Sequence, residues 1–277
     1  MHCKFHFKQA LGAVSIALAG LAGAQAQTIK AGVLSVGSDL TYPPYAFMEK
    51  GQPAGFDVDF SYLLAKHASL KPEFLDTRFA DLVLGLRAKR FDAVASALFV
   101  TPERAKLVDY VPYLKTGSSL LVLEGSTYAP AQIADLCGKR LATIKGASWT
   151  PKLNKFSAEN CKPKNAGDIK ILEFPTTPEA LMALKSKAAD LLMEDAAVAH
   201  GLAARKDSGL KVSSTEVIYP MVIGVGLHKD ASELKGLLSK ALDGAKASGE
   251  YQALLSKYGL EAPSESDVRD ALAGTAK

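Results

Sequence analysis

The 277-residue sequence lacks a long uncharged apolar stretch beyond its first two dozen residues. Because a membrane-spanning helix needs about 20 consecutive apolar residues, no anchor is expected in the mature chain. The sequence also lacks the G-x-S-x-G, phosphate-loop and H-E-x-x-H motifs. Its histidines, among them His67, His200 and His228, are too scattered to indicate a metal site. We therefore expect neither a metal nor an organic cofactor.

The first 26 residues have the pattern of a secretory signal peptide. Lys4 and Lys8 precede an apolar run over residues 10–22, which leads to the small-x-small sequence at residues 24–26. We expect cleavage before Gln27 and a mature protein in the periplasm.

Cysteine is scarce, with three residues in the whole chain. Cys3 lies in the basic segment of the leader and would leave with it. Cys137 and Cys161 remain, and in an oxidising compartment we expect them to form a disulfide. The alternative is a pair of free, buried thiols.

Neither sign of charge is in large excess. The chain has 33 Lys and Arg against 29 Asp and Glu, and loss of Lys4 and Lys8 with the leader leaves 31 against 29. A net charge near +2 argues against nucleic acid or a membrane surface as a partner. About 250 mature residues favour two domains over one.

Apolar segments typical of strands alternate with amphipathic segments typical of helices. The expected strands lie at residues 31–37, 74–76, 92–96, 119–124, 140–144, 168–174, 190–194 and 221–229. The expected helices begin near residue 57 and lie around 82–86, 131–136, 151–158, 178–188, 196–206 and 234–242. This alternation predicts two α/β units in series, each a doubly wound mixed sheet flanked by helices. Such sheets bind ligands at the carboxyl ends of their strands.

Seven segments in fixed order carry a resemblance to a known family. They are GSDLTYPPYAF, GFDVDF, RFDAVAS, TPERAKLVDY, KGASW, AADLLMED and SGEYQALLSKYG. With them the chain resembles the extracellular solute-binding proteins of the polar amino-acid type (family 3), the periplasmic receptors of ATP-binding-cassette importers. The resemblance implies the type II periplasmic binding fold, in which two lobes joined by two hinge strands close over a small molecule. It also implies a non-enzymatic monomer that binds an amino acid or a related carboxylate and docks on a permease in the inner membrane.

The resemblance also implies a division of the chain. Residues 1–26 are the signal peptide, and residues 27–116 form the first part of lobe 1. Residues 117–218 form lobe 2, and residues 219–262 return to lobe 1 with the C-terminal helices. Residues 263–277 are small and polar, so we expect a loosely held tail.

Two charged residues match the family positions that hold the backbone of an amino acid. Arg104 matches the arginine that binds the ligand carboxylate, and a planar guanidinium donates two parallel hydrogen bonds to such a group. Asp195 matches the acid that pairs with the α-ammonium, although it is also placed to cap the helix that follows. Glu194 is the alternative acid if the register is shifted by one.

The remaining matched positions surround the ligand. Tyr42 and Phe79 match the walls that enclose its side chain, and Asp39 matches an acid often found at the side-chain end. Gly146 and Ser148 match the turn whose N–H groups and hydroxyl meet the carboxylate. The other matched lining positions are Ser96, Ala97 and Phe99.

Phe99 departs from the family pattern, which has a small hydroxyl residue whose oxygen accepts a hydrogen bond from the α-ammonium. Three hypotheses follow. Phe99 points into its own lobe while a backbone carbonyl and Asp195 hold the ammonium; or the ligand carries a substituent on that nitrogen, as an opine does; or the ligand is an organic acid without the ammonium. A further departure is Ala147, which replaces a hydroxyl residue, with Trp149 following soon after.

The main alternative function is enzymatic, because the fold also resembles exported cyclohexadienyl dehydratases. In such an enzyme Asp195 or Glu194 would help to expel the leaving group. A sensor that reports its ligand to a separate membrane receptor is a third possibility.

Overall fold

The computed structural model describes residues 1–2 and 28–275, so the predicted signal peptide lies almost wholly outside the described residues. The strands are β1 (Val33–Ser38), β2 (Thr41–Tyr42), β3 (Ala46–Glu49), β4 (Gln52–Ala54), β5 (Lys71–Asp76), β6 (Ala93–Val94), β7 (Val108–Leu123), β8 (Arg140–Ile144), β9 (Lys170–Phe174), β10 (Leu191–Asp195), β11 (Leu210–Val212) and β12 (Ile218–His228). The α-helices are α1 (Phe56–His67), α2 (Leu82–Arg87), α3 (Pro102–Ala105), α4 (Trp149–Phe156), α5 (Thr177–Lys185), α6 (Ala196–Ala203), α7 (Ser232–Ala247), α8 (Glu250–Tyr258) and α9 (Glu265–Ala273).

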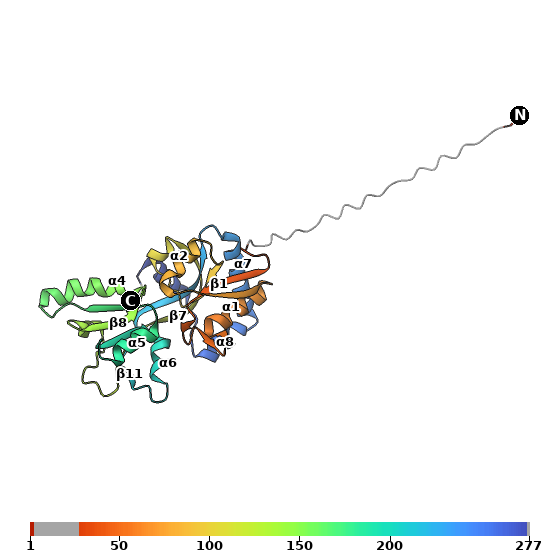
Figure 1. The fold of residues 1–277 in the computed structure, drawn as a ribbon. Coiled ribbons are helices and arrows are strands. Elements are labelled where there is room, and N and C mark those ends of the chain that lie inside the picture. The colour runs from red at the N-terminus through yellow and green to blue at the C-terminus, as the bar shows by residue number, and fades with distance from the viewer. Residues whose placement is uncertain (3–27, 276–277) are drawn as a thin grey trace.

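Two long strands, β7 and β12, join the two halves of the molecule. The strand order is β5-β1-β6-β12-β7-β10-β8-β9, with β11 also paired to β7. β1 is parallel to β5 and β6, and β8 is parallel to β9 and β10, whereas β7 is antiparallel to both β12 and β10. The predicted mixed α/β fold with two lobes is confirmed. Figure 1 shows α1, α2, α7 and α8 around one end and α4, α5 and α6 around the other, with β7 between them.

The pattern of apolar residues explains how the helices pack. In α1, Phe56, Phe60 and Leu64 recur at helical spacing and are at most 1% exposed. In α7, the helix expected around residues 234–242, Leu234, Leu238, Ala241 and Leu242 form a buried stripe. Both helices belong to the lobe that contains β1, which we call lobe 1; the lobe that contains β8 is lobe 2.

Three local predictions need correction. The helix expected over residues 131–136 is only a 3₁₀ turn at Ile133–Leu136. A small hairpin sheet, β2-β3-β4, was not expected and forms around the YPPY turn. The tail is not loosely held in its described part, because Glu265–Ala273 form α9, which a capping box between Ser264 and Asp267 initiates.

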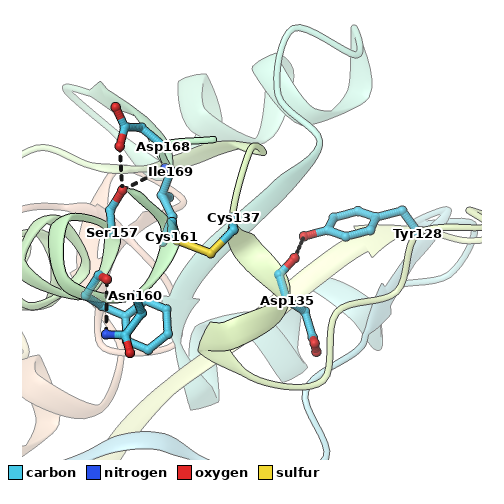
Figure 2. The surroundings of a disulfide bond; sticks show 9 residues. Tyr128, Asp135, Cys137, Ser157, Asn160, Cys161, Asp168 and Ile169 are labelled. Atoms are coloured by element: carbon cyan, nitrogen blue, oxygen red, sulfur yellow. Dashed lines mark hydrogen bonds between the residues drawn. A yellow bond between two sulfur atoms is a disulfide. The ribbon is translucent and has the colours of Figure 1, made fainter. Parts of the chain in front are cut away.

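The predicted disulfide between Cys137 and Cys161 is confirmed, with the two Cα atoms 5.4 Å apart. It joins the end of the 3₁₀ turn to a π-helical turn, Ser157–Cys161, that continues α4. Figure 2 shows that Ser157 lies beside the bridge and bonds to both Asp168 and Ile169. The bridge and the Ser157 hydrogen bonds together tie three segments of lobe 2.

Over residues 28–275, no helix is both long and apolar enough to cross a bilayer. In that same part of the chain, no three His, Cys, Asp or Glu side chains are placed to hold a metal ion.

Candidate functional site

Arg104 lies where the two lobes meet. Thr101 caps α3, Pro102 occupies its first turn, and these residues place Arg104 at the edge of the cleft. The guanidinium donates to the carbonyl oxygen of Phe99 in lobe 1 at 3.0 Å and to that of Gly146 in lobe 2 at 2.9 Å. Burial lowers the pKa of Arg104 from its ordinary value, but an arginine remains charged at neutral pH. Three of its five N–H groups are left for a carboxylate.

A small pocket beside Arg104 is lined mainly by rings and methyl groups. Its volume is about 10 Å³, which admits roughly one water molecule. The lining residues are Tyr42, Phe79, Ala97, Phe99, Arg104, Ile144, Ala147, Ser148 and Trp149. We call this the inner pocket. An outer cavity of about 470 Å³ adjoins it and shares Arg104, Ala147 and Ser148, so the groups expected to bind a carboxylate lie where the two spaces meet.

The ring of Phe99 faces the cleft. The segment around it pairs with β12 through Val100 N to Val222 O and Gly224 N to Leu98 O. Because side chains alternate along extended backbone, Leu98 and Val100 point into a cluster within lobe 1, whereas Phe99 points the other way. Its ring makes an edge contact with Trp149 of lobe 2, with centroids 5.8 Å apart. The hypothesis that Phe99 points into its own lobe is therefore wrong.

Ala97 redirects the chain just before Phe99. Its φ is 46°, which is unusual for a residue with a side chain, so the backbone is strained at this point of the site. The buried carboxylate of Asp57 accepts a 2.6 Å hydrogen bond from Ala97 N and another from Tyr113. Burial raises the pKa of Asp57 to about 6. The bend that aims Phe99 thus depends on a carboxylate that the sequence alone did not single out.

Glu194 and Asp195 form the second cross-lobe contact, directly behind the pocket. Glu194 accepts hydrogen bonds from Tyr42 of lobe 1 at 2.9 Å and from Thr177 at 2.7 Å. Asp195 accepts one from Tyr45 of lobe 1 at 2.9 Å and one from Thr116 at 2.8 Å, and it caps α6. Both acids are fully buried, and neither lines the inner pocket.

Burial is the main cause of the altered acidity of this pair. It raises the pKa of Glu194 to about 7 and that of Asp195 to about 6. The charge of Asp195 further raises the pKa of Glu194, and both carboxylates raise the pKa of Tyr42. The hydroxyl donors oppose these shifts because they stabilise the ionised form. At neutral pH Glu194 is therefore near its midpoint of titration.

Two predicted contact residues lie behind the pocket wall. Asp39 is fully buried and accepts hydrogen bonds from Thr41 and from Phe79 N, and it pairs with Arg78 at 3.0 Å. The hydroxyl of Ser96 accepts a hydrogen bond from Asp39 N at 3.0 Å. In this arrangement Asp39 and Ser96 position Phe79, and they do not line the inner pocket.

The glycine at position 146 is required by its surroundings. Its φ is 85°, and a Cβ there would lie 3.3 Å from the Cα of Ala80 in lobe 1. Ser148 lines both cavities, as expected for the carboxylate turn. Trp149 also lines the inner pocket but was not among the expected site residues. Its position directly after Ser148 in the KGASW turn could have indicated this.

Comparison with known proteins is consistent with this geometry. The family model for bacterial extracellular solute-binding proteins, family 3, matches residues 34–261. The L-arginine-binding protein of Pseudomonas aeruginosa is 26% identical over 231 residues, which cover 80% of this chain and 86% of that protein. A mutant of ArgBP from T. maritima is 29% identical with a TM-score of 0.74, covering 82% of this chain and 95% of that one. The ancestral amino acid-binding protein AncCDT-1, a precursor of cyclohexadienyl dehydratase, is 30% identical with a TM-score of 0.70, covering 82% and 95%.

Proposed function

The chain belongs to the bacterial extracellular solute-binding proteins of family 3, and from this premise we propose that it captures a small carboxylate for an ATP-binding-cassette importer. The ligand is an amino acid or an amino-acid-like acid, held between the lobes by hinge closure. A permease in the inner membrane then recognises the closed, loaded monomer. The protein acts in the periplasm, to which residues 1–26 direct it before they are removed.

The position of Arg104 carries this proposal. Its guanidinium contacts one backbone carbonyl from each lobe and lies beside Ser148 at the junction of the two cavities. A carboxylate bound there would touch groups from both lobes at once, so ligand binding would favour the closed arrangement. The centroid of the Phe79 ring lies 5.5 Å from the Arg104 Cζ atom, within the range of a cation–π contact.

The hinge that we propose lies in β7 and β12. These strands run through both lobes, and their pairing shifts register between Ile218 and Met221. Tyr219, within that shift, has a φ of 50°. On this basis lobe 1 comprises residues 27–116 and 219–262, and lobe 2 comprises residues 117–218.

We also propose that binding occurs without chemical change. A dehydratase would need a carboxylate facing the substrate, but the oxygens of Asp195 and Glu194 already accept from hydroxyl groups or helix N–H groups. Incubation with prephenate and with arogenate, followed by assay for phenylpyruvate and phenylalanine, tests this. Turnover above the uncatalysed rate would establish the enzymatic alternative.

The first experiment is a thermal-shift screen of refolded, ligand-stripped mature protein against amino acids, opines and organic acids. A ligand that binds only the folded state raises the melting temperature. The hits are then titrated calorimetrically against wild type and Arg104→Ala. We expect Arg104→Ala to lose binding and keep a cooperative unfolding transition, because the carboxylate has lost its charged partner.

Arg205→Ala is the matched control, since Arg205 is an exposed arginine of lobe 2 far along the chain from the site. It should bind as wild type does. Unchanged affinity in Arg104→Ala would refute the carboxylate assignment.

A further inference from the structure

We propose that the ligand is a carboxylic acid without a free α-ammonium group, with an aromatic or branched aliphatic remainder. A 2-oxo acid or a simple aryl-alkanoic acid fits this description. The inference rests on the proposed function, because it takes Arg104 as the carboxylate partner. It concerns the position next to that carboxylate, where an ordinary amino acid carries its positively charged α-ammonium.

The first observation is that rings occupy the part of the inner pocket where the family pattern places the α-ammonium of the ligand. Phe99 of lobe 1 and Trp149 of lobe 2 meet edge to face there, 4% and 3% exposed. The indole N–H donates to Thr143 at 2.8 Å, and Thr143 in turn donates to Met193 O at 2.9 Å. Trp149 is therefore fixed in orientation and presents only carbon to the pocket.

The second observation is that the nearby carboxylates already have their partners. Asp195 accepts from Tyr45, Thr116 and Ala197 N, and Glu194 accepts from Tyr42 and Thr177. The two tyrosines reach across from lobe 1, so closure itself supplies these donors. Among the described residues that line the inner pocket, no side chain carries a negative charge.

The third observation concerns the backbone carbonyls that face the same region. Phe99 O accepts from Arg104 at 3.0 Å and from Tyr110 at 3.4 Å. Gly146 O accepts from Arg104 at 2.9 Å. An ammonium bound here would therefore compete with the guanidinium that binds the carboxylate of the same ligand, and two cations would share one pair of acceptors.

Two acids, Glu103 and Glu173, line the outer cavity, but they suit an ammonium poorly. Both are exposed, and the Glu173 carboxylate already accepts from Gly146 N and Thr150 at 3.4 Å each, at the start of α4. Ion pairs in water contribute little to affinity. The site as a whole therefore offers a cation for a carboxylate and a nearly apolar wall beyond it. An ammonium buried there without an acceptor weakens binding by about tenfold or more.

The test compares ligands that differ only at the nitrogen. Calorimetric titration of the mature, ligand-stripped protein uses phenylalanine, phenylpyruvate, 3-phenylpropanoate and an N-(1-carboxyethyl) derivative of phenylalanine. A second set uses leucine, 4-methyl-2-oxopentanoate and 4-methylpentanoate. We expect the acids without nitrogen to bind at least about tenfold more tightly than the amino acid of the same set.

A variant at position 99 tests whether the Phe99 ring causes the preference for acids without nitrogen. Phe99→Ser restores a hydroxyl acceptor and should reduce the preference for the nitrogen-free acid by about tenfold while binding still depends on Arg104. Phe47→Ser is the control, because Phe47 is a partly buried ring on β3 that lines neither cavity, and it should keep the wild-type preference. If Phe99→Ser does not fold, the wild-type comparison decides by itself.

The possible outcomes separate the two proposals. Equal or tighter binding of phenylalanine or leucine, lost in Arg104→Ala, overturns this inference and leaves the proposed receptor function standing. Tightest binding of the N-carboxyethyl derivative also overturns it, in favour of a substituted nitrogen. A melting-temperature shift with any other amino acid, and none with an organic acid, overturns this inference alone. If no member of either set binds and no amino acid, opine or organic acid of the screen raises the melting temperature, both proposals fall.

Discussion

At the scale of single residues, the site depends on polar groups that serve two partners. Arg104 holds one carbonyl from each lobe, and Glu194 accepts one hydroxyl from each lobe. Burying such an acid costs little free energy only while it is protonated, because burial destabilises the charged form. Glu194 should therefore make the stability of the closed protein depend on pH.

The prediction concerns Glu194→Gln, which keeps the shape and an acceptor but cannot ionise. Because the folded state raises the pKa of Glu194 from 4.5 to about 7, its stabilising contribution is complete below pH 4.5 and is lost as pH rises to about 7. Wild type should thus lose stability relative to Glu194→Gln over that interval, by up to about 3 kcal/mol. Urea unfolding at several pH values measures this difference. Glu216→Gln, at an exposed position, should show no such trend with pH. If Glu194 were ionised over this whole pH range, the difference in stability between wild type and Glu194→Gln would not change with pH.

The sequence allowed the residues that line the inner pocket to be predicted better than the residues that hold them in place. Arg104, Tyr42, Phe79 and Ser148 lie in short segments whose resemblance to the family is local, and the structure brings them to the cleft. Asp195 was expected to face the ligand, but its donors Tyr45 and Thr116 are distant in sequence, so their convergence depends on the closed fold.

At the scale of elements, alternation of strand and helix predicted most strands and helices of both lobes because each segment has its own apolar period. The strands of the two lobes form one continuous sheet through β7 and β12, where a separate sheet in each lobe was expected. What it missed were elements stabilised by their surroundings. The tail sequence is polar, yet α9 forms because Ala271 is buried, Asp267 pairs with Lys115 at 3.0 Å, and Gly274 packs beside Pro102 of α3. The C-terminus thus supports the short helix that carries Arg104.

The disulfide should stabilise lobe 2 without affecting the site. It closes a loop with a sequence separation of 24 residues, which by loop entropy stabilises the fold by about 3 kcal/mol. Cys137→Ala with Cys161→Ala should lower the free energy of unfolding by about that amount and leave ligand affinity within about twofold, since neither cysteine lines the inner pocket or the outer cavity. Urea unfolding and calorimetry measure the two effects, with reduced wild type as the comparison. A large loss of affinity would show that the bridge positions the site.

At the scale of the whole molecule, closure brings together groups that stabilise one another only when the lobes meet. The hydroxyls of Tyr42 and Tyr45 in lobe 1 donate hydrogen bonds to Glu194 and Asp195 of lobe 2. The two tyrosine rings stack with their centroids 6.0 Å apart. Both partners in each bond are protein groups. We therefore expect these bonds to bias the free protein toward closure, with the contacts of Arg104 and the rings added when ligand binds.

Replacement of both tyrosines with phenylalanine should shift the free protein toward an open form. Each hydroxyl lost leaves a buried carboxylate with one donor fewer, which weakens closure by about 1 to 3 kcal/mol per site. Small-angle X-ray scattering of ligand-free Tyr42→Phe/Tyr45→Phe should give a larger radius of gyration than wild type, and saturating ligand should restore the wild-type value. Tyr62→Phe is the control, because that ring is 54% exposed on α1 and should change nothing. An unchanged radius in the double variant would mean that the tyrosine bonds follow closure without favouring it.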